Sequence, residues 1–177
     1  VADVLYLAPE EPLWRFEHQP VPGHDYDVCG PDSFKRIAMN DGKPGIPGGP
    51  VYQLITIAHR GAMTLERARK LRDLVNAGAA LLGEPPLATP GLAGFPHADD
   101  ELRAIALELW GSTPEAERKV GKGRVFRGIP VPDALKRLGS RGTVKLGSDG
   151  VQVVLGPIAD QVAGDIRKHL GNAPRVQ

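Results

Sequence analysis

Residues 51–83, VYQLITIAHRGAMTLERARKLRDLVNAGAALLG, decide the fold class. The run 52–58 is almost continuously apolar and rich in β-branched residues, which is typical of a strand buried on both faces of a parallel sheet. Thr64 predicts a helix N-cap, because its hydroxyl can accept a backbone N–H from the first turn. Gly78 predicts the end of this helix, and residues 79–82 predict a second short buried strand. Strand, helix and strand with short links predict a βαβ unit with a right-handed crossover.

The helix predicted after Thr64 is amphipathic. Helical spacing places an apolar face toward the core, formed by Leu65, Ala68, Leu71, Leu74 and Val75. Charged residues are expected on the opposite face, exposed to water: Arg67, Lys70, Arg72 and Asp73. This pattern indicates an architecture and leaves the chemistry open.

The composition is that of a soluble globular protein. The 177 residues are 41% hydrophobic and 24% charged, and Lys+Arg 22 against Asp+Glu 21 leaves a net charge of +1. This balance indicates neither a nucleic-acid partner nor an anionic membrane partner. A single cysteine excludes an internal disulfide and a cysteine-based zinc site. Because the sequence starts without methionine and without a signal-peptide layout, we expect a piece of a longer polypeptide of unknown compartment.

Further elements are predicted around the central unit. Strands are expected at residues 4–8, 26–29, 43–47 and 123–128, and helices at 31–38, 97–110 and 131–138. The tail predicts a β-hairpin of 143–146 and 151–155, a helix at 158–170 and a disordered segment at 171–177. The sequence thus predicts an α/β three-layer sandwich with a mostly parallel sheet over residues 1–139, and residues 140–170 appended to it as a β-hairpin plus helix.

The sequence contains no strong catalytic motif. The strand 79–82 ends in Gly-Glu-Pro-Pro and lacks the nucleophile turn of the G-x-S-x-G type. Cys29 is expected to be buried and inert, because no neighbour at a diagnostic spacing would lower its pKa; a reactive thiol is the alternative. Asp25 and Asp27 share one side of a predicted strand and could form an acid–base pair, although adjacent solvated carboxylates are far more common.

The histidines are scattered along the chain, and none of their spacings is typical of a metal site: His18, His24, His59, His97 and His169. The glycine-rich pieces 45–49 and 121–124 lack the spacing of a phosphate-binding loop. We therefore assign no catalytic, cofactor-binding or metal-binding residue, and we expect no cofactor.

A series of blocks in the sequence resembles a known family. The blocks are residues 1–7 (VADVLYL), 26–34 (YDVCGPDSF), 41–57 (DGKPGIPGGPVYQLITI), 63–83, 98–111 (ADDELRAIALELWG) and 121–128 (GKGRVFRG). In this order they are similar to bacterial α-L-rhamnosidases of glycoside hydrolase family 106, over about residues 1–139. The resemblance implies a flavodoxin-like, class I glutamine-amidotransferase-like domain that lies beyond the catalytic barrel. It implies that the catalytic carboxylates and the calcium site lie elsewhere in the parent polypeptide, and it assigns no catalytic residue to this chain.

The tail resembles a different family. Residues 134–170, and especially 150–167 (GVQVVLGPIADQVAGDIR), are similar to the end of the enzyme IIB domain of sugar phosphotransferase systems. The phosphoryl-accepting cysteine motif of that domain has no counterpart in the matching region 112–123. The resemblance therefore covers only the half of that domain that does not accept phosphate.

Three functional hypotheses follow. The first is a non-catalytic accessory domain of a large glycosidase, which packs on the parent's catalytic barrel and has carbohydrate as a second candidate partner. Trp14, Phe16 and Trp110 are its candidate sugar-stacking residues, although core packing is the more common role for Trp110 at the end of an amphipathic helix. The second is a phosphoryl carrier that uses Cys29, and the third is an interaction module with no role in sugar chemistry.

Overall fold

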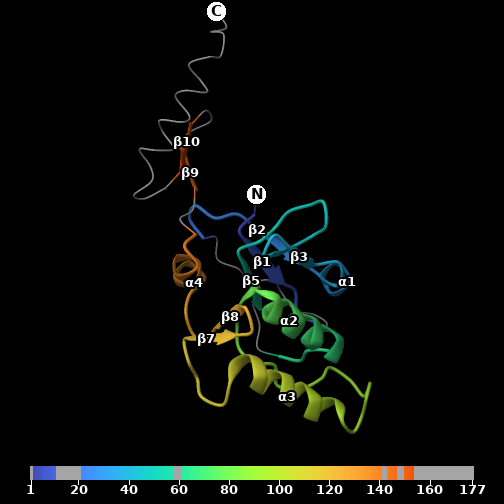
Figure 1. Ribbon diagram of the computed structural model, residues 1–177. Helices are drawn as coiled ribbons and strands as arrows, with labels where there is room; N and C mark the ends of the chain where they lie inside the picture. The colour runs from blue at the N-terminus through green and yellow to red at the C-terminus, as the bar shows by residue number, and fades with distance from the viewer. Residues whose placement is uncertain (1, 11–20, 58–60, 141–142, 147–149, 154–177) are drawn as a thin grey trace, which may run out of the picture. The chain divides into compact units, whose positions relative to one another are not determined.

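The computed structural model describes residues 2–10, 21–57, 61–140, 143–146 and 150–153 (Figure 1). By its internal contacts the chain divides into two compact units, residues 1–140 and residues 141–177. Each unit is described by itself below.

The first unit is built on a six-stranded sheet in the order β2-β1-β5-β6-β8-β7. Its strands are β1 (Val4–Leu7), β2 (Tyr26–Cys29), β5 (Leu54–Ile57), β6 (Ala80–Leu82), β7 (Glu117–Val120) and β8 (Gly123–Phe126). All neighbours pair in parallel except β7 and β8, which are antiparallel. The order of the five parallel strands is that of flavodoxin-like sheets. The predicted mostly parallel sheet is confirmed.

Helices cover both faces of this sheet, as Figure 1 shows. The helices are α1 (Pro31–Lys35), α2 (Leu65–Ala77), α3 (Ala98–Trp110) and α4 (Val131–Arg137). Side chains of β1 alternate between two cores: Leu5 and Leu7 pack in the core with α1, α2 and α3, while Val4 and Tyr6 pack in the core with α4. This alternation is the period of a strand buried on both faces. The predicted three-layer α/β sandwich is confirmed.

A small antiparallel hairpin precedes the central unit. It pairs β3 (Ala38–Asn40) with β4 (Lys43–Gly45). The connecting residues Asp41 and Gly42 have φ of 47° and 79°, the positive values that a tight two-residue hairpin turn requires at both central positions.

The central βαβ unit forms as the sequence predicts. The α2 helix begins after Thr64, whose Oγ1 accepts the Arg67 N–H over 3.4 Å. It ends at Gly78, where φ is 128° and a side chain would be strained. The predicted exposure of Arg67 is wrong, because its side chain is only 6% exposed. Arg67 lies in the first turn of α2, where its guanidinium contacts the Ala8 carbonyl oxygen and lies near Glu10, both just after β1.

One strand of the sheet was not expected from the sequence. The β7 segment, ERKV, carries three charged residues in a row and has no alternation of apolar and polar positions. It is the antiparallel edge strand of the sheet, and charged side chains are common on such edges because they discourage pairing with other chains.

The second unit contains the antiparallel hairpin of β9 (Thr143–Leu146) and β10 (Gly150–Val153), which confirms the predicted hairpin. The predicted helix 158–170 and the predicted tail 171–177 lie outside the described residues. None of the helices in the described part of the chain has the length and apolar character needed to cross a membrane.

Candidate functional site

The strand order creates a switch point between β1 and β5. From β1 the chain continues to β2 on one side, and from β5 it continues to β6 on the other side. In open α/β sheets, ligands bind in the crevice outside the carboxyl ends of the strands at such a point. Here that edge is formed by the residues after β1, up to Glu10, and by the N-terminus of α2 (Figure 1).

Glu10 is bound to the N-terminus of α2. Its carboxylate accepts the Thr64 backbone N–H over 2.7 Å and the Thr64 hydroxyl over 2.8 Å. The Glu10 side chain is 9% exposed. A carboxylate is stable at this position because the helix dipole presents partial positive charge there and the first N–H groups lack helical partners.

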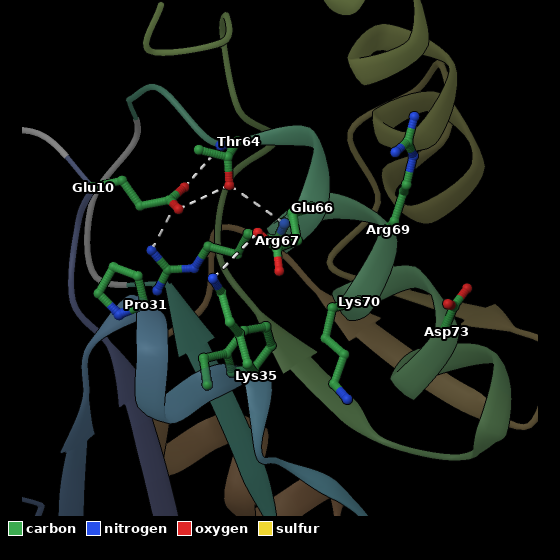
Figure 2. Close-up of a pocket in the computed structure, with 10 residues that line it drawn as sticks. Glu10, Pro31, Lys35, Thr64, Glu66, Arg67, Arg69, Lys70 and Asp73 are labelled. Carbon is green, nitrogen blue, oxygen red and sulfur yellow. Dashed lines mark hydrogen bonds and ion pairs between the residues drawn. The ribbon is translucent and has the colours of Figure 1, made fainter. Parts of the chain in front are cut away.

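Arg67 lies beside Glu10 and is buried. Its Nη1 donates to the Ala8 carbonyl oxygen over 2.6 Å and lies 3.9 Å from Glu10 Oε2. Its Cζ is 5.7 Å from the centre of the Phe34 ring, a cation–π distance. Desolvation lowers the pKa of Arg67, and the charge of Glu10 opposes this shift; a guanidinium keeps its proton in proteins. Figure 2 shows the guanidinium between Glu10 and Pro31.

Two nitrogens of Arg67 have no hydrogen-bond partner among the described residues. They are Nε and Nη2, and both are shielded from solvent. Only one of the three guanidinium nitrogens is therefore engaged in a hydrogen bond within the described structure.

A pocket of about 380 Å³ adjoins these residues, between α1 and the first turns of α2 (Figure 2). Its lining has four cationic side chains, Lys35, Arg67, Arg69 and Lys70, and three carboxylates, Glu10, Glu66 and Asp73. Pro31, Phe34 and Thr64 complete it. The volume lies within the range of small-molecule sites.

Ion pairs neutralise most of the charges that line the pocket. Lys35 Nζ is 3.4 Å from Glu66 Oε2, and this carboxylate is the largest cause that raises the pKa of Lys35. Arg69 binds Glu101 on α3, with Nε and Nη2 each 2.6 Å from a carboxylate oxygen. The Asp73 carboxylate accepts two hydrogen bonds from Arg72. Lys70 has no carboxylate partner among the residues that the structure describes.

Cys29 is buried, as predicted. Its side chain is 4% exposed, and its Sγ is 3.4 Å from the Gly30 carbonyl oxygen. Desolvation raises the pKa of the Cys29 thiol, and the charge of Arg67 opposes this only in part. A neutral, covered thiol is a poor nucleophile.

Asp27 of β2 and Asp25, just before this strand, have structural contacts. Asp27 accepts a hydrogen bond from the Tyr52 hydroxyl over 3.0 Å. The Asp25 carbonyl oxygen accepts the Asp3 N–H over 2.8 Å. Burial, and then the bond to Asp27, raises the pKa of Tyr52. Neither aspartate lines the pocket at the switch point.

The predicted histidines do not meet at the pocket. His24 Nδ1 is 2.9 Å from Asp3 Oδ2, and His97 lies just before α3. The other three histidines, at 18, 59 and 169, lie outside the described residues. Over the ranges that the structure describes, no group of three His, Cys, Asp or Glu side chains could hold a metal ion.

Trp110 packs in the core, as its helical position indicated. It is 3% exposed, and its Nε1 donates to the Gly83 carbonyl oxygen over 2.7 Å. It is therefore not available to stack on a sugar. Trp14 and Phe16 lie outside the described residues.

Glu10 and Arg67 are the residues that the sequence did not single out as a site. The available signal was topological, because Glu10 follows the first predicted strand and Arg67 lies in the first turn of the helix predicted after Thr64. The end of such a strand and the start of such a helix meet at the carboxyl edge of a parallel sheet. The helical pattern alone placed Arg67 among the exposed charges.

Comparison with known proteins agrees with the resemblance found in the sequence. A curated protein of Formosa agariphila that carries the provisional name beta-glucuronidase is 29% identical over 129 residues, which are 73% of this chain and 10% of that protein. The solved structure of a rhamnosidase from Novosphingobium sp. PP1Y superposes with a TM-score of 0.69 and 25% identity, over 84% of this chain and 15% of the enzyme. This chain thus spans between a tenth and a sixth of the length of these relatives.

The family match covers more than the blocks that suggested it. The model of the alpha-L-rhamnosidase family, glycoside hydrolase family 106, matches residues 1–154. It includes the β9–β10 hairpin, and so extends into the tail that also resembles enzyme IIB; that second resemblance stays a prediction. Since the match covers most of its length, the chain belongs to the alpha-L-rhamnosidase family, glycoside hydrolase family 106.

Proposed function

We propose that this chain is a non-catalytic, amidotransferase-like accessory domain of a larger glycosidase that acts on carbohydrate. The observation that carries the proposal is the coverage: the chain matches the Novosphingobium rhamnosidase over 84% of its own length but over only 15% of the enzyme. The hydrolytic residues would then lie in the remainder of the parent polypeptide.

The chemistry of the described site supports this role. Glu10, the carboxylate at the switch point, is engaged by both polar groups of Thr64 and lies beside the buried cation of Arg67. These contacts hold the carboxylate to the chain itself. The same reasoning disfavours the phosphoryl-carrier alternative, because the thiol of Cys29 is covered and its pKa is raised.

An exposed apolar surface supports packing against the rest of the parent. Leu87, Leu92 and Phe95, in the loop before α3, are 62%, 82% and 75% exposed. The loop is fixed near them, since Asp99 accepts the Thr89 N–H over 2.9 Å and its hydroxyl over 2.8 Å. Apolar side chains held outward on an ordered loop mark an interaction surface. We assign this 87–95 surface to contact with the remainder of the parent glycosidase, including its catalytic barrel.

The test compares this chain with the polypeptide that carries it. Hydrolysis of an aryl α-L-rhamnoside is measured for the purified 177-residue chain and for the full parent, with the parent lacking its own catalytic carboxylates as the blank. We expect turnover by the parent and none by the chain. Turnover by the chain that persists through purification would overturn the proposal.

A further inference from the structure

The guanidinium of Arg67 is the least satisfied polar group in the described core. Its side chain is 6% exposed, and Nε and Nη2 have no hydrogen-bond partner among the described residues. A buried N–H of a charged group without an acceptor is costly, so such groups are almost always paired in folded proteins. The nearest carboxylate, Glu10, is 3.9 Å from Nη1, on the nitrogen that already donates to Ala8. Glu10 therefore does not satisfy the Nε and Nη2 groups.

The unsatisfied edge has the shape that binds an oxyanion. Arg69, two residues further along α2, uses the same two nitrogens to bind both oxygens of Glu101, at 2.6 Å each. Two parallel N–H groups match the spacing of carboxylate and phosphate oxygens, which makes this pairing strong and geometrically selective. Arg67 presents an equivalent edge that no carboxylate of the described chain occupies.

The charge of the pocket favours the same ligand. Three cation–carboxylate pairs involve residues of the lining. They are Arg69 with Glu101, Lys35 with Glu66, and Arg72 with Asp73. Because pairing neutralises these charges, the cationic groups of the lining that remain for a negatively charged ligand are Lys70 and the unsatisfied edge of Arg67. Among the carboxylates that line the pocket, Glu10 is the one close to the guanidinium, and it already accepts two hydrogen bonds from Thr64.

We propose that the pocket between α1 and α2 binds an oxyanion, the carboxylate or phosphate group of a small molecule, through Nε and Nη2 of Arg67 with Lys70 as a second cation. Entry requires side chains of the lining to move. Lys35 can rotate at the least cost, because it is 54% exposed and its contacts to Glu66 and Asp32 are surface ion pairs. This inference concerns the chain itself and does not depend on the proposed accessory role.

The test is isothermal titration of the purified chain with inorganic phosphate and with D-glucuronate, and with D-glucose as the uncharged match for the sugar. We expect one or both anions to bind at millimolar concentration or below, and glucose to give no heat. Phosphate alone would identify a phosphate site, and glucuronate alone a carboxylate site. The absence of heat from both anions would overturn the proposal.

Two variants assign the binding to these residues. Arg67→Lys keeps a positive charge and loses the two-nitrogen edge, so the affinity is expected to fall about tenfold. Lys70→Met is expected to weaken binding about threefold, and Lys119→Met, on the exposed part of β7, serves as its control. Circular dichroism and denaturation establish that each variant is folded. Equal affinity of Arg67→Lys and the unmodified chain would exclude the proposed contact.

Discussion

Arg67 Nη1 donates to the carbonyl oxygen of Ala8 over 2.6 Å, and this bond joins α2 to the end of β1. The two residues are 59 positions apart in the chain. The carbonyl belongs to the residue just past the end of β1. Arg67 therefore connects the end of the first strand to the central helix, and it also lines the pocket between α1 and α2.

Removal of the Arg67 side chain, and with it this connection, is expected to destabilise the domain strongly. Arg67→Ala leaves the Ala8 carbonyl without its donor and removes the cation beside the nearly buried Glu10. Loss of one partner of a buried, charged contact costs about 3 kcal/mol in the free energy of unfolding. Urea denaturation followed by circular dichroism measures the change. Arg69→Ala is the matched control, since its ion pair with Glu101 is exposed. Its free energy of unfolding is expected to be close to that of the unmodified chain. Equal losses of stability in the two variants would contradict the proposed role of the Arg67 contact.

The cap at Thr64 contributes to the same junction. Its hydroxyl accepts the Arg67 N–H and donates to Glu10, so one side chain completes the helix N-terminus and holds the segment after β1. Thr64→Ala is expected to cost about 2 kcal/mol, at the upper end of N-cap substitutions. Thr64→Ser keeps the hydroxyl and is expected to restore most of the stability in the same denaturation experiment. A serine variant as unstable as the alanine variant would show that the methyl group, and not the cap, is responsible.

The elements of the fold were predictable where local signals agree. Thr64 and Gly78 bound α2 because a hydroxyl cap and a glycine with positive φ satisfy the helix ends locally. The exposure of Arg67 was not predictable from helical spacing, since its burial depends on Glu10 and Ala8, which are distant in sequence. The edge strand β7 was also missed, because its stability comes from pairing with β8 and not from its own composition. Long-range polar contacts thus determine the parts of the site that sequence patterns do not.

Gly123 is expected to tolerate no side chain. A Cβ at this position would lie 2.3 Å from the carbonyl oxygens of Ala79 and Val75, because β8 starts directly against the end of α2. Gly123→Ala is expected to cost about 3 kcal/mol, since the clash is with backbone that cannot rotate away. Gly91→Ala is the control, because a Cβ there meets nothing within 4 Å. The melting temperatures of both variants test the prediction, and an unchanged value for Gly123→Ala would contradict this close approach.

Stability is expected to fall at alkaline pH through Tyr52. Burial, and then the bond to Asp27, raises the pKa of Tyr52 in the folded chain above the value of about 10 expected when unfolded. The folded state therefore holds the phenol proton more tightly, so this contribution is complete below pH about 10 and is lost as the pH rises further. Tyr52→Phe is expected to make the loss of stability above that pH shallower, although Tyr6, whose pKa is also raised by burial, retains part of it.

Asp27→Asn separates the two causes of the Tyr52 effect. It removes the negative charge and keeps an acceptor for the hydroxyl, and because burial is the larger cause it is expected to keep most of the alkaline slope. The free energy of unfolding of the three proteins, measured in urea from neutral to alkaline pH, gives the slopes. If Asp27→Asn removed as much of the slope as Tyr52→Phe, charge and not burial would be the dominant cause.

The 87–95 surface gives a prediction for the parent polypeptide. Leu92 and Phe95 are 82% and 75% exposed, so replacing both by serine removes few contacts within this domain and is expected to leave the stability of the isolated chain unchanged. In the parent, the same double variant would place hydroxyls where apolar contact is proposed, and the melting temperature should fall. Leu107→Ser is the control, since Leu107 is also exposed, at 56%, but lies on α3 outside this surface. Differential scanning calorimetry of the parent and of the chain separates the outcomes: a lower value in the parent alone supports the contact, because the cost then arises between domains. An equal fall in both proteins would place the cost within this domain, and no fall in either would remove this surface from the interface.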